Sequence, residues 1–151
     1  MTINPIPEGY YSLTPYLIIK DAAKAIEFYK AAFDTREKFR MERPDGSVGH
    51  TELLIGGSMI MLTDEALERG CKGPSAYGGC PISLHLYVDN ADQVVDKAIA
   101  AGATLNRPVE NQFYGDRSGA VIAPFGYVCH IASRIENLSD EEIKQRGAKS
   151  T

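Results

Sequence analysis

The chain has 151 residues, a formal net charge of −4 and 44% hydrophobic residues, as in an ordinary globular protein of one domain or two small ones sharing a core. No apolar run approaches the ~20 residues that cross a bilayer, and nothing resembles a signal peptide. We therefore expect a cytoplasmic protein without a membrane partner. Basic residues are outnumbered 16 to 20 by acidic ones, which argues against a nucleic-acid groove. Three cysteines without a CxxC pair indicate reduced thiols.

The two halves of the chain show the same pattern when one is shifted by 69 residues. The shift places Leu13–Asp21 on Ile82–Asn90 and Gly57–Thr63 on Gly126–Ala132. Few identities survive, but residue types and turns agree in position. An internal repeat of this kind predicts two copies of one supersecondary unit. Each copy is predicted to contain a strand, a helix and then three strands.

The first copy begins with a β-branched and aromatic run over Leu13–Ile19, which is typical of a strand. Asp21 follows and is predicted to cap a helix that ends at Asp34 and Thr35. Apolar residues recur at helical spacing and give this helix one buried face: Ile26, Tyr29, Ala32 and Phe33. Three strands separated by a proline–glycine turn and a two-glycine hairpin complete the copy: Glu37–Glu42, Val48–Ile55 and Ser58–Thr63.

The second copy follows residues 65–80, which are rich in glycine and are expected to form a flexible linker. Its helix is capped by Asn90 or Asp92 and runs to Ala101, where Gly102 stops it. Its four strands are predicted at the equivalent places: Ile82–Val88, Thr104–Val109, Gly119–Ile122 and Tyr127–Ser133.

Strand alternation assigns side chains to one face or the other of each sheet. The hairpin at Gly56-Gly57 pairs Ile55 with Ser58, and Glu52 then faces Met61. The side chains predicted to point away from the helix in the first copy are Thr14, Tyr16, Ile18, His50, Glu52, Leu54, Met59, Met61 and Thr63. In the second copy they are Ser83, His85, Tyr87, Val128, His130 and Ala132, with Arg117 added across a longer turn. All three histidines of the chain map to these faces.

The repeat, taken with five short segments, resembles the vicinal oxygen chelate superfamily of glyoxalases, bleomycin-resistance proteins and ring-cleaving dioxygenases. Within it the PhnB-like branch is the most similar. The segments are Thr14-Pro15-Tyr16, Phe28-Tyr29, Ser83–Asp89, Tyr114–Gly119 and Pro124–Gly126. The resemblance implies an α+β fold of two tandem βαβββ modules whose cupped mixed sheets surround a shared cavity, and it implies a homodimer.

Module one would span residues 10–64 and module two residues 81–134, in a single glyoxalase-like domain. The tail over 135–151 is predicted to contain a short helix at Ser139–Arg146, because Ser139 and Glu142 have the spacing of a capping box.

The resemblance places a divalent metal on four positions, which here are Tyr16, Met61, His85 and His130. Only the two histidines are good ligands for iron, manganese, nickel or zinc, since tyrosine is uncommon and a thioether is soft. Glu52, opposite Met61, is a candidate carboxylate ligand. A metal-free protein, in which the histidines are hydrogen-bonded linings, remains an alternative at least as well supported.

Two functions follow, and both take a small-molecule ligand. The first is a metal-dependent lyase, isomerase or oxygenase in which Glu52 or His50 is the general base. The second is a metal-free protein that sequesters an antibiotic or metabolite without catalysis. The predicted ligand-binding residues are Tyr16, Met61, Tyr87 and Arg117. Arg117 is interpreted either as a clamp on a carboxylate or phosphonate or as a structural ion pair with Asp116.

Overall fold

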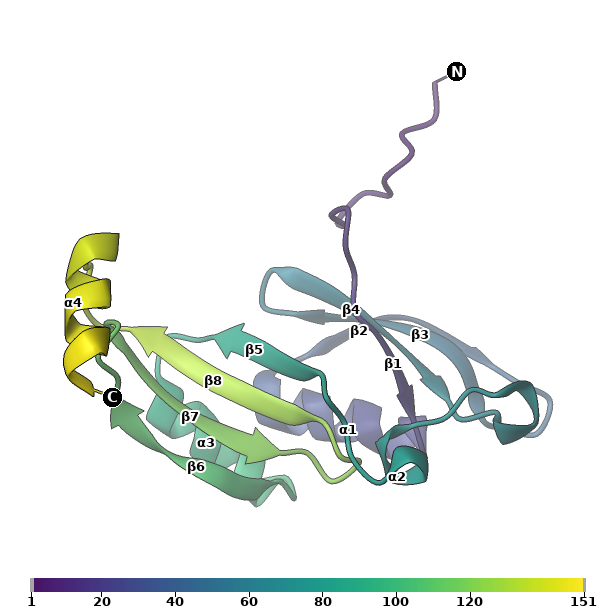
Figure 1. Ribbon diagram of the computed structural model, residues 1–151. Coiled ribbons are helices and arrows are strands. Elements are labelled where there is room, and N and C mark those ends of the chain that lie inside the picture. The colour runs from purple at the N-terminus through teal and green to yellow at the C-terminus, as the bar shows by residue number, and fades with distance from the viewer. Residues whose placement is uncertain (1, 151) are drawn as a thin grey trace. The chain divides into compact units, whose positions relative to one another are not determined.

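The structure is a computed structural model that describes residues 2–150. It contains two four-stranded mixed sheets with a helix on each (Figure 1). The chain divides into two compact units between Gly79 and Cys80. Each unit holds one strand–helix–three-strand module, so the predicted α+β fold of tandem βαβββ modules is confirmed. No helix within residues 2–150 has the length and apolar character needed to span a membrane.

Module one has the predicted elements in the predicted order. They are β1 (Tyr16–Ile19), α1 (Ala22–Phe33), β2 (Arg36–Glu42), β3 (Val48–Ile55) and β4 (Ser58–Asp64). The strand order is β1-β4-β3-β2, with β1 parallel to β4 and the other pairs antiparallel. Strand β1 begins later than predicted, because Pro15 has no N–H to donate and the preceding Leu13 is exposed.

The helix α1 is not capped by Asp21 as predicted. Asp21 takes the left-handed conformation, with φ of 66°, and its side chain accepts no cap hydrogen bond. The cap comes from the far end of the module. Asp64 at the end of β4 accepts the backbone N–H of Ala22 at 2.7 Å with Oδ1 and that of Val48 at 2.7 Å with Oδ2. One carboxylate therefore ties the helix start to two strands.

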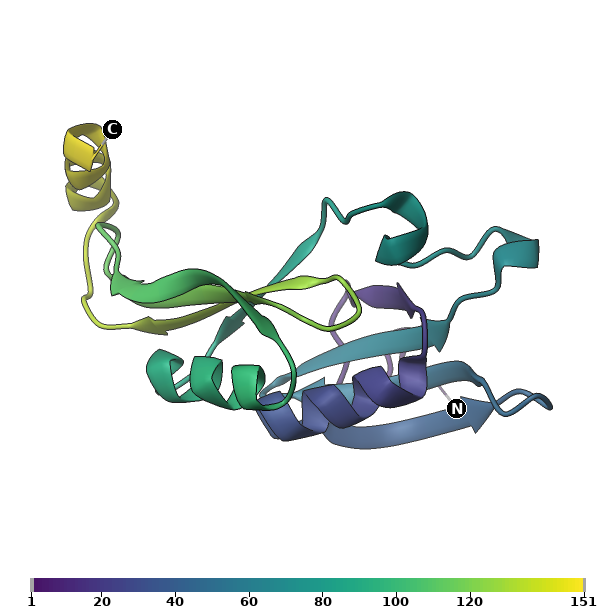
Figure 2. The ribbon, with the colours of Figure 1, turned by 90° about the horizontal axis from the view of Figure 1, so that it is seen from below.

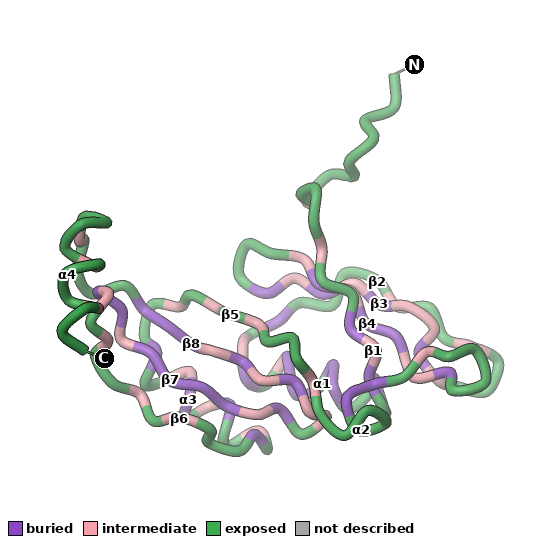
Figure 3. Tube along the Cα trace, in the orientation of Figure 1, coloured by how far each residue is buried: buried purple, intermediate pink, exposed green. Residues whose placement is uncertain are grey.

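The core of module one lies between α1 and one face of the sheet (Figure 2). Helix α1 buries Ile26, Tyr29 and Ala32 against buried residues of β1, β3 and β4, whereas β2 has no buried residue. The predicted pairing of Glu52 with Met61 and of Ile55 with Ser58 is confirmed. The alternation of buried and partly exposed positions is visible along the strands in Figure 3. Each fully buried leucine or isoleucine contributes about 1.5–3 kcal/mol.

Module two repeats this architecture. Its elements are β5 (Ser83–Tyr87), α3 (Ala91–Ala100), β6 (Thr104–Asn111), β7 (Asp116–Ile122) and β8 (Val128–Arg134), with strand order β5-β8-β7-β6. Asn90 caps α3 by accepting the backbone N–H of Gln93, which decides between the two predicted caps. Gly102, with φ of 116°, follows the helix as predicted. The sheet packs on α3 through β6, β7 and β8.

The two segments outside the modules also contain helices. Residues 65–80, expected to be a flexible linker, hold a 3₁₀ turn η1 (Leu67–Arg69) and a one-turn helix α2 (Pro74–Tyr77). Proline at the first position of α2 is preset for a helix. The tail forms α4 (Asp140–Ser150). Ser139 Oγ accepts the backbone N–H of Glu142 at 3.2 Å, as predicted, whereas the Glu142 carboxylate accepts the Ser139 hydroxyl at 3.2 Å and not the backbone N–H of a full capping box.

Candidate functional site

A row of four side chains crosses module one on the sheet face opposite α1. Tyr16 pairs with Met61, Met61 with Glu52, and Glu52 with Phe39, one residue from each strand. Paired residues project to the same side of a sheet. We call this face the open face of module one and define it by six residues: Tyr16, Phe39, Met41, His50, Glu52 and Met61. Four of them are predicted site residues, and the structure brings those four together.

Hydrogen bonds link the polar residues of the open face into one chain. Glu52 Oε1 accepts the hydroxyl of Tyr10, which precedes β1. Glu52 Oε2 lies 3.0 Å from His50 Nε2, and His50 Nδ1 lies 2.9 Å from the hydroxyl of Tyr16. The side chains of His50 and Glu52 are 22% and 25% exposed. The order of the chain is therefore Tyr10–Glu52–His50–Tyr16.

This chain determines the charge of the site. The hydroxyl of Tyr10, and next to it His50, lower the pKa of Glu52 against the opposing effect of burial. Burial and the Glu52 carboxylate together raise the pKa of Tyr10 to about 12. Burial is also the main cause of the raised pKa of Tyr16, which the charge of Arg43 opposes. At neutral pH the site therefore has an ionised carboxylate between two neutral phenols.

Apolar side chains surround this polar chain and are accessible. Tyr16, Phe39 and Met41 are 49%, 49% and 54% exposed. The rings of Tyr16 and Phe39 lie on either side of His50, with centroids 5.5 and 6.2 Å from the imidazole. An ionised group set among exposed aromatic and thioether side chains is the usual composition of a small-molecule site.

The open face of module two, opposite α3, carries a different set. His85 pairs with His130 on neighbouring parallel strands, and their rings stack with centroids 5.9 Å apart. Burial, and next Arg107 and His85, lower the pKa of His130, which favours the neutral imidazole. The residue paired with His130 from β7 is Ala120, at the place that Glu52 holds in module one. The carboxylate–imidazole pair of module one thus has no counterpart here.

Tyr87 lies on the same face beside His85, with ring centroids 4.9 Å apart. Its hydroxyl donates to Asp116 Oδ2 at 3.2 Å, and the Asp116 side chain is almost fully buried. A cavity of about 350 Å³ lies at the end of this strand pair. It is lined by Tyr87, Val88, Asp89, Ser133 and Arg134.

Arg117 does not lie on the open face, which corrects its predicted place. It pairs with Ser133, whereas His130 pairs with Ala120, so Arg117 projects to the opposite side of the sheet. There its guanidinium donates two hydrogen bonds, of 2.7 and 2.9 Å, to Asp92 at the start of α3. Arg117 therefore forms a structural ion pair, as one of the two interpretations predicted, but its partner is Asp92. The predicted partner, Asp116, projects to the other face of the sheet.

The donor set for a metal is incomplete within the described residues. Among residues 2–150, no three or more histidine, cysteine, aspartate or glutamate side chains gather in a way that could hold an ion. His85 and His130 provide two nitrogens, and Glu52, the expected carboxylate, has both oxygens engaged by Tyr10 and His50. Three or four such ligands are the rule for zinc and iron. His85 and His130 supply only two of these ligands, so we derive no metal-dependent step from them.

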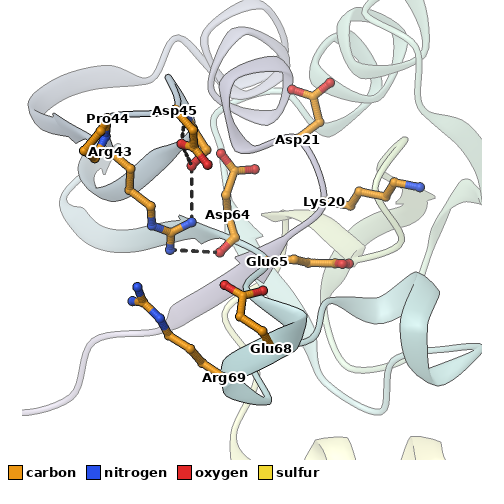
Figure 4. A pocket seen from close by; sticks show the side chains of 10 residues that line it. Lys20, Asp21, Arg43, Pro44, Asp45, Asp64, Glu65, Glu68 and Arg69 are labelled. Carbon is orange, nitrogen blue, oxygen red and sulfur yellow. Dashed lines mark hydrogen bonds between the residues drawn. The ribbon is translucent and has the colours of Figure 1, made fainter.

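A second cavity, of about 490 Å³, lies at the start of α1 and beside the β2–β3 turn (Figure 4). Charges of both signs line it, and none of the predicted site residues does. Its lining residues are Lys20, Asp21, Arg43, Pro44, Asp45, Ser47, Asp64, Glu65, Glu68 and Arg69. Several of these groups are already committed to the fold: Asp64 caps α1, and Arg43 bonds Ser47 and Thr63.

Sequence reasoning missed Tyr10. It stands in a polar segment before the first predicted strand, and neither periodicity nor residue type distinguishes it from its neighbour Tyr11. Only the hydrogen bond to Glu52, 42 residues away, reveals its role.

Comparisons with known proteins agree with this fold. The profile of the Glyoxalase/Bleomycin resistance protein/Dioxygenase superfamily matches residues 11–131, and the chain belongs to that superfamily. An uncharacterized protein of Mycobacterium bovis is 38% identical over 95% of this chain and 94% of its own. An uncharacterized protein of Mycobacterium tuberculosis is 38% identical over 95% and 84%. The superfamily predicted from the sequence is thereby confirmed.

Three solved structures illustrate the likeness. A gene product of Arabidopsis thaliana is 25% identical, with a TM-score of 0.67 over 82% of this chain and 98% of its own. A fosfomycin resistance protein from Listeria monocytogenes is 17% identical, with a TM-score of 0.63 over 88% and 97%. A PhnB protein from Bacillus cereus is 16% identical, with a TM-score of 0.63 over 82% and 99%. At these last two identities the likeness concerns the fold alone.

Proposed function

We propose that this protein binds a small organic molecule on the open face of module one. The observation that carries the proposal is the ionised Glu52, three-quarters buried and held by Tyr10 and His50, on a face that also has accessible aromatic surface. Burying a carboxylate costs free energy unless hydrogen bonds compensate for the lost water. Groups with perturbed pKa values of this kind cluster at functional sites. A pre-organised polar group within apolar surroundings is what fixes the orientation of a ligand.

The open face defines the chemistry of the ligand. Phe39, Met41 and Met61 offer an apolar surface, and methionine adapts to ligands of varied shape. Tyr16, half exposed, is the most accessible residue of the hydrogen-bonded chain, and its hydroxyl is the polar group it can offer to a ligand. We therefore expect a molecule with an apolar or aromatic body and at least one hydrogen-bonding oxygen or nitrogen.

The test is a binding screen of small aromatic and heterocyclic compounds, antibiotics included because a protein of this fold is named for fosfomycin resistance. Equilibrium dialysis measures Kd for the wild type, for Glu52→Gln and for the control Glu42→Gln, an exposed residue of β2 in the same module. Glu52→Gln disturbs the hydrogen bonds that orient His50 and Tyr16. A misplaced hydrogen bond to the ligand costs about 0.5–1.5 kcal/mol, so Kd should weaken by roughly 2- to 10-fold. Glu42→Gln should leave it unchanged. The absence of any binder, or equal weakening by both variants, would refute the proposal.

A metal centre on His85 and His130 is a second candidate, favoured by the adjacent rings and by the lowered pKa of His130. Neutral imidazole is the form that binds metals. Elemental mass spectrometry after loading with Mn, Fe(II), Ni or Zn and desalting tests it, with His85→Ala and His130→Ala in parallel. Near-stoichiometric metal that both variants lose would support this candidate, and a wild type that retains none would exclude a tight site.

A further inference from the structure

The hydrogen-bond chain of module one has an accessible end and a closed end. At the closed end both Glu52 oxygens are occupied, one by the Tyr10 hydroxyl and the other by His50 Nε2. At the accessible end Tyr16 is 49% exposed and its hydroxyl contacts His50 Nδ1 at 2.9 Å. A ligand on the open face therefore meets Tyr16 before it meets Glu52. The inference that follows rests on the proposed function, because it names the kind of ligand this face takes.

The ionised carboxylate sets the direction of every hydrogen bond in the chain. A carboxylate only accepts, so His50 Nε2 carries a hydrogen and donates it to Glu52. In the neutral imidazole the other nitrogen, Nδ1, then has a lone pair. That lone pair accepts the hydrogen of the Tyr16 hydroxyl. The oxygen of Tyr16 is left with lone pairs for the ligand, so in this state it is an acceptor for a ligand hydroxyl.

We propose that Tyr16 and His50 form a proton relay that ionises a weakly acidic hydroxyl of the bound molecule. The ligand O–H bond breaks and its proton forms a new O–H bond on Tyr16. At the same time the original Tyr16 O–H bond breaks, and that proton forms an N–H bond at His50 Nδ1. The products are a ligand oxyanion and an imidazolium, and no oxidant or other reactant is needed.

The geometry around the relay supports each role. The imidazolium would form 3.0 Å from the Glu52 carboxylate, which stabilises the positive charge and keeps the ring oriented. Glu52 is then a positioning residue, whereas the sequence offered it as a general base. Tyr16 is neutral before and after the transfer, in keeping with its raised pKa. Besides His50, the charged or titratable groups that act on Tyr16 are Arg43, Cys71 and Glu52.

Module two shows that the fold itself does not require this relay. The residue of β7 that pairs with His130 is Ala120, and the next residue on the same face of β7 is Ser118, so neither supplies a carboxylate. The superfamily architecture is complete there without a carboxylate–imidazole–phenol chain. The chain in module one is therefore a feature of its side chains, and the ligand class it selects is a small molecule with a weakly acidic hydroxyl, such as a phenol.

The experiment uses para-nitrophenol, whose phenolate is yellow and whose neutral form is not. The probe is titrated with the full-length protein over a pH series, and the phenolate absorbance is measured per bound probe. For the wild type we expect the bound probe to ionise at least ~1 pH unit below the free probe, a tenfold shift in its ionisation equilibrium. Nitrogen NMR of the His50 ring should show Nδ1 gaining a proton as the probe binds.

Three variants separate the relay from simple binding. Tyr16→Phe and His50→Gln should bind the probe as the neutral phenol and lose the tenfold shift, while the exposed Tyr11→Phe should keep it. Thermal unfolding checks that each variant is folded. If Tyr16→Phe does not fold, His50→Gln alone decides the test. The relay is overturned if the shift persists in either variant or if wild-type protein binds the probe without it. It is also overturned if other compounds bind the open face and phenols do not, whereas the absence of any binder contradicts the proposed function instead.

Discussion

Asp64 and Ser133 hold equivalent positions in the two modules, and each accepts the first backbone N–H of its module's helix. Asp64 Oδ1 takes the N–H of Ala22 at 2.7 Å, and Ser133 Oγ takes that of Ala91 at 2.9 Å. Both residues lie on the last strand, 69 positions apart, which is the period of the sequence repeat. The repeat therefore extends to the hydrogen bond that fastens each helix to its sheet.

The first prediction concerns the Asp64 cap. Asp64→Asn keeps one acceptor oxygen but cannot accept both the Ala22 and the Val48 N–H groups. It should lower the free energy of unfolding by about 1–2 kcal/mol in urea titrations. Asp21→Asn is the matched control, because Asp21 caps nothing and asparagine tolerates its left-handed conformation. Equal losses in the two variants would show that Asp64 is not the functional cap.

The second prediction concerns close packing under β7. A Cβ on Gly119 would lie 2.9 Å from the backbone oxygen of Arg107 and 2.9 Å from Val109, closer than real contacts allow. Gly119→Ala should therefore cost about 1–3 kcal/mol, since the backbone must move. Gly57→Ala has open space around it and should change the free energy of unfolding by less than about 0.5 kcal/mol. A neutral Gly119→Ala would contradict the β6–β7 register.

The third prediction concerns the pKa of Glu52. The Tyr10 hydroxyl is the largest cause that lowers it, so Tyr10→Phe should raise the pKa of Glu52 toward its usual value of about 4.3. A carboxyl whose pKa is lowered in the folded state stabilises the fold above its unfolded pKa and loses that effect as the pH falls. The free energy of unfolding of Tyr10→Phe should therefore fall less than that of the wild type as the pH drops below about 5. Carbon NMR of the carboxyl measures the titration, and Tyr11→Phe should leave it where it is in the wild type.

The fourth prediction concerns His130, whose pKa is lowered mainly by burial. The unfolded chain takes up this proton at a higher pH than the folded chain, so stability falls as the pH drops through the ordinary histidine value of about 6.5. His130→Gln should flatten this part of the pH–stability curve measured by urea unfolding. His85→Gln removes only the smallest of the three causes and should flatten it less. An unchanged curve for His130→Gln would contradict the assigned environment.

Local patterns were enough to predict most of the fold. The register of Ile55 with Ser58 follows from a two-glycine hairpin, and the alternation of Leu53 with His50 and Glu52 follows from strand geometry alone. The cap of α1 could not be predicted, because Asp21 has the right residue type next to the helix and Asp64 is 42 residues away. Long-range partners of this kind leave no local signal.

The sequence likewise predicted which side chains of the candidate site share a face, but not their long-range partners. His50 and Glu52 are two apart on a strand, so they had to share a face, and Met61 followed from the hairpin. Arg117 was placed on the wrong face because the length of the turn after Ile122 left the register of β7 uncertain by one residue. A register shift of one residue moves every side chain of a strand to the opposite face of the sheet. The contact of Tyr10 with Glu52, and with it the ionised state of the site, needed the structure.

Methyl NMR of the methionines, recorded with the strongest binder from the screen, shows directly whether a ligand lies on the open face. Met41 and Met61 lie on the open face of module one, where they pair with His50 and Glu52. A ligand bound there should shift both methyl signals with the same Kd that dialysis gives, and Glu52→Gln should weaken that response. A compound that binds by dialysis but leaves both methyl signals unmoved would bind elsewhere, and the open face would then not be the ligand site.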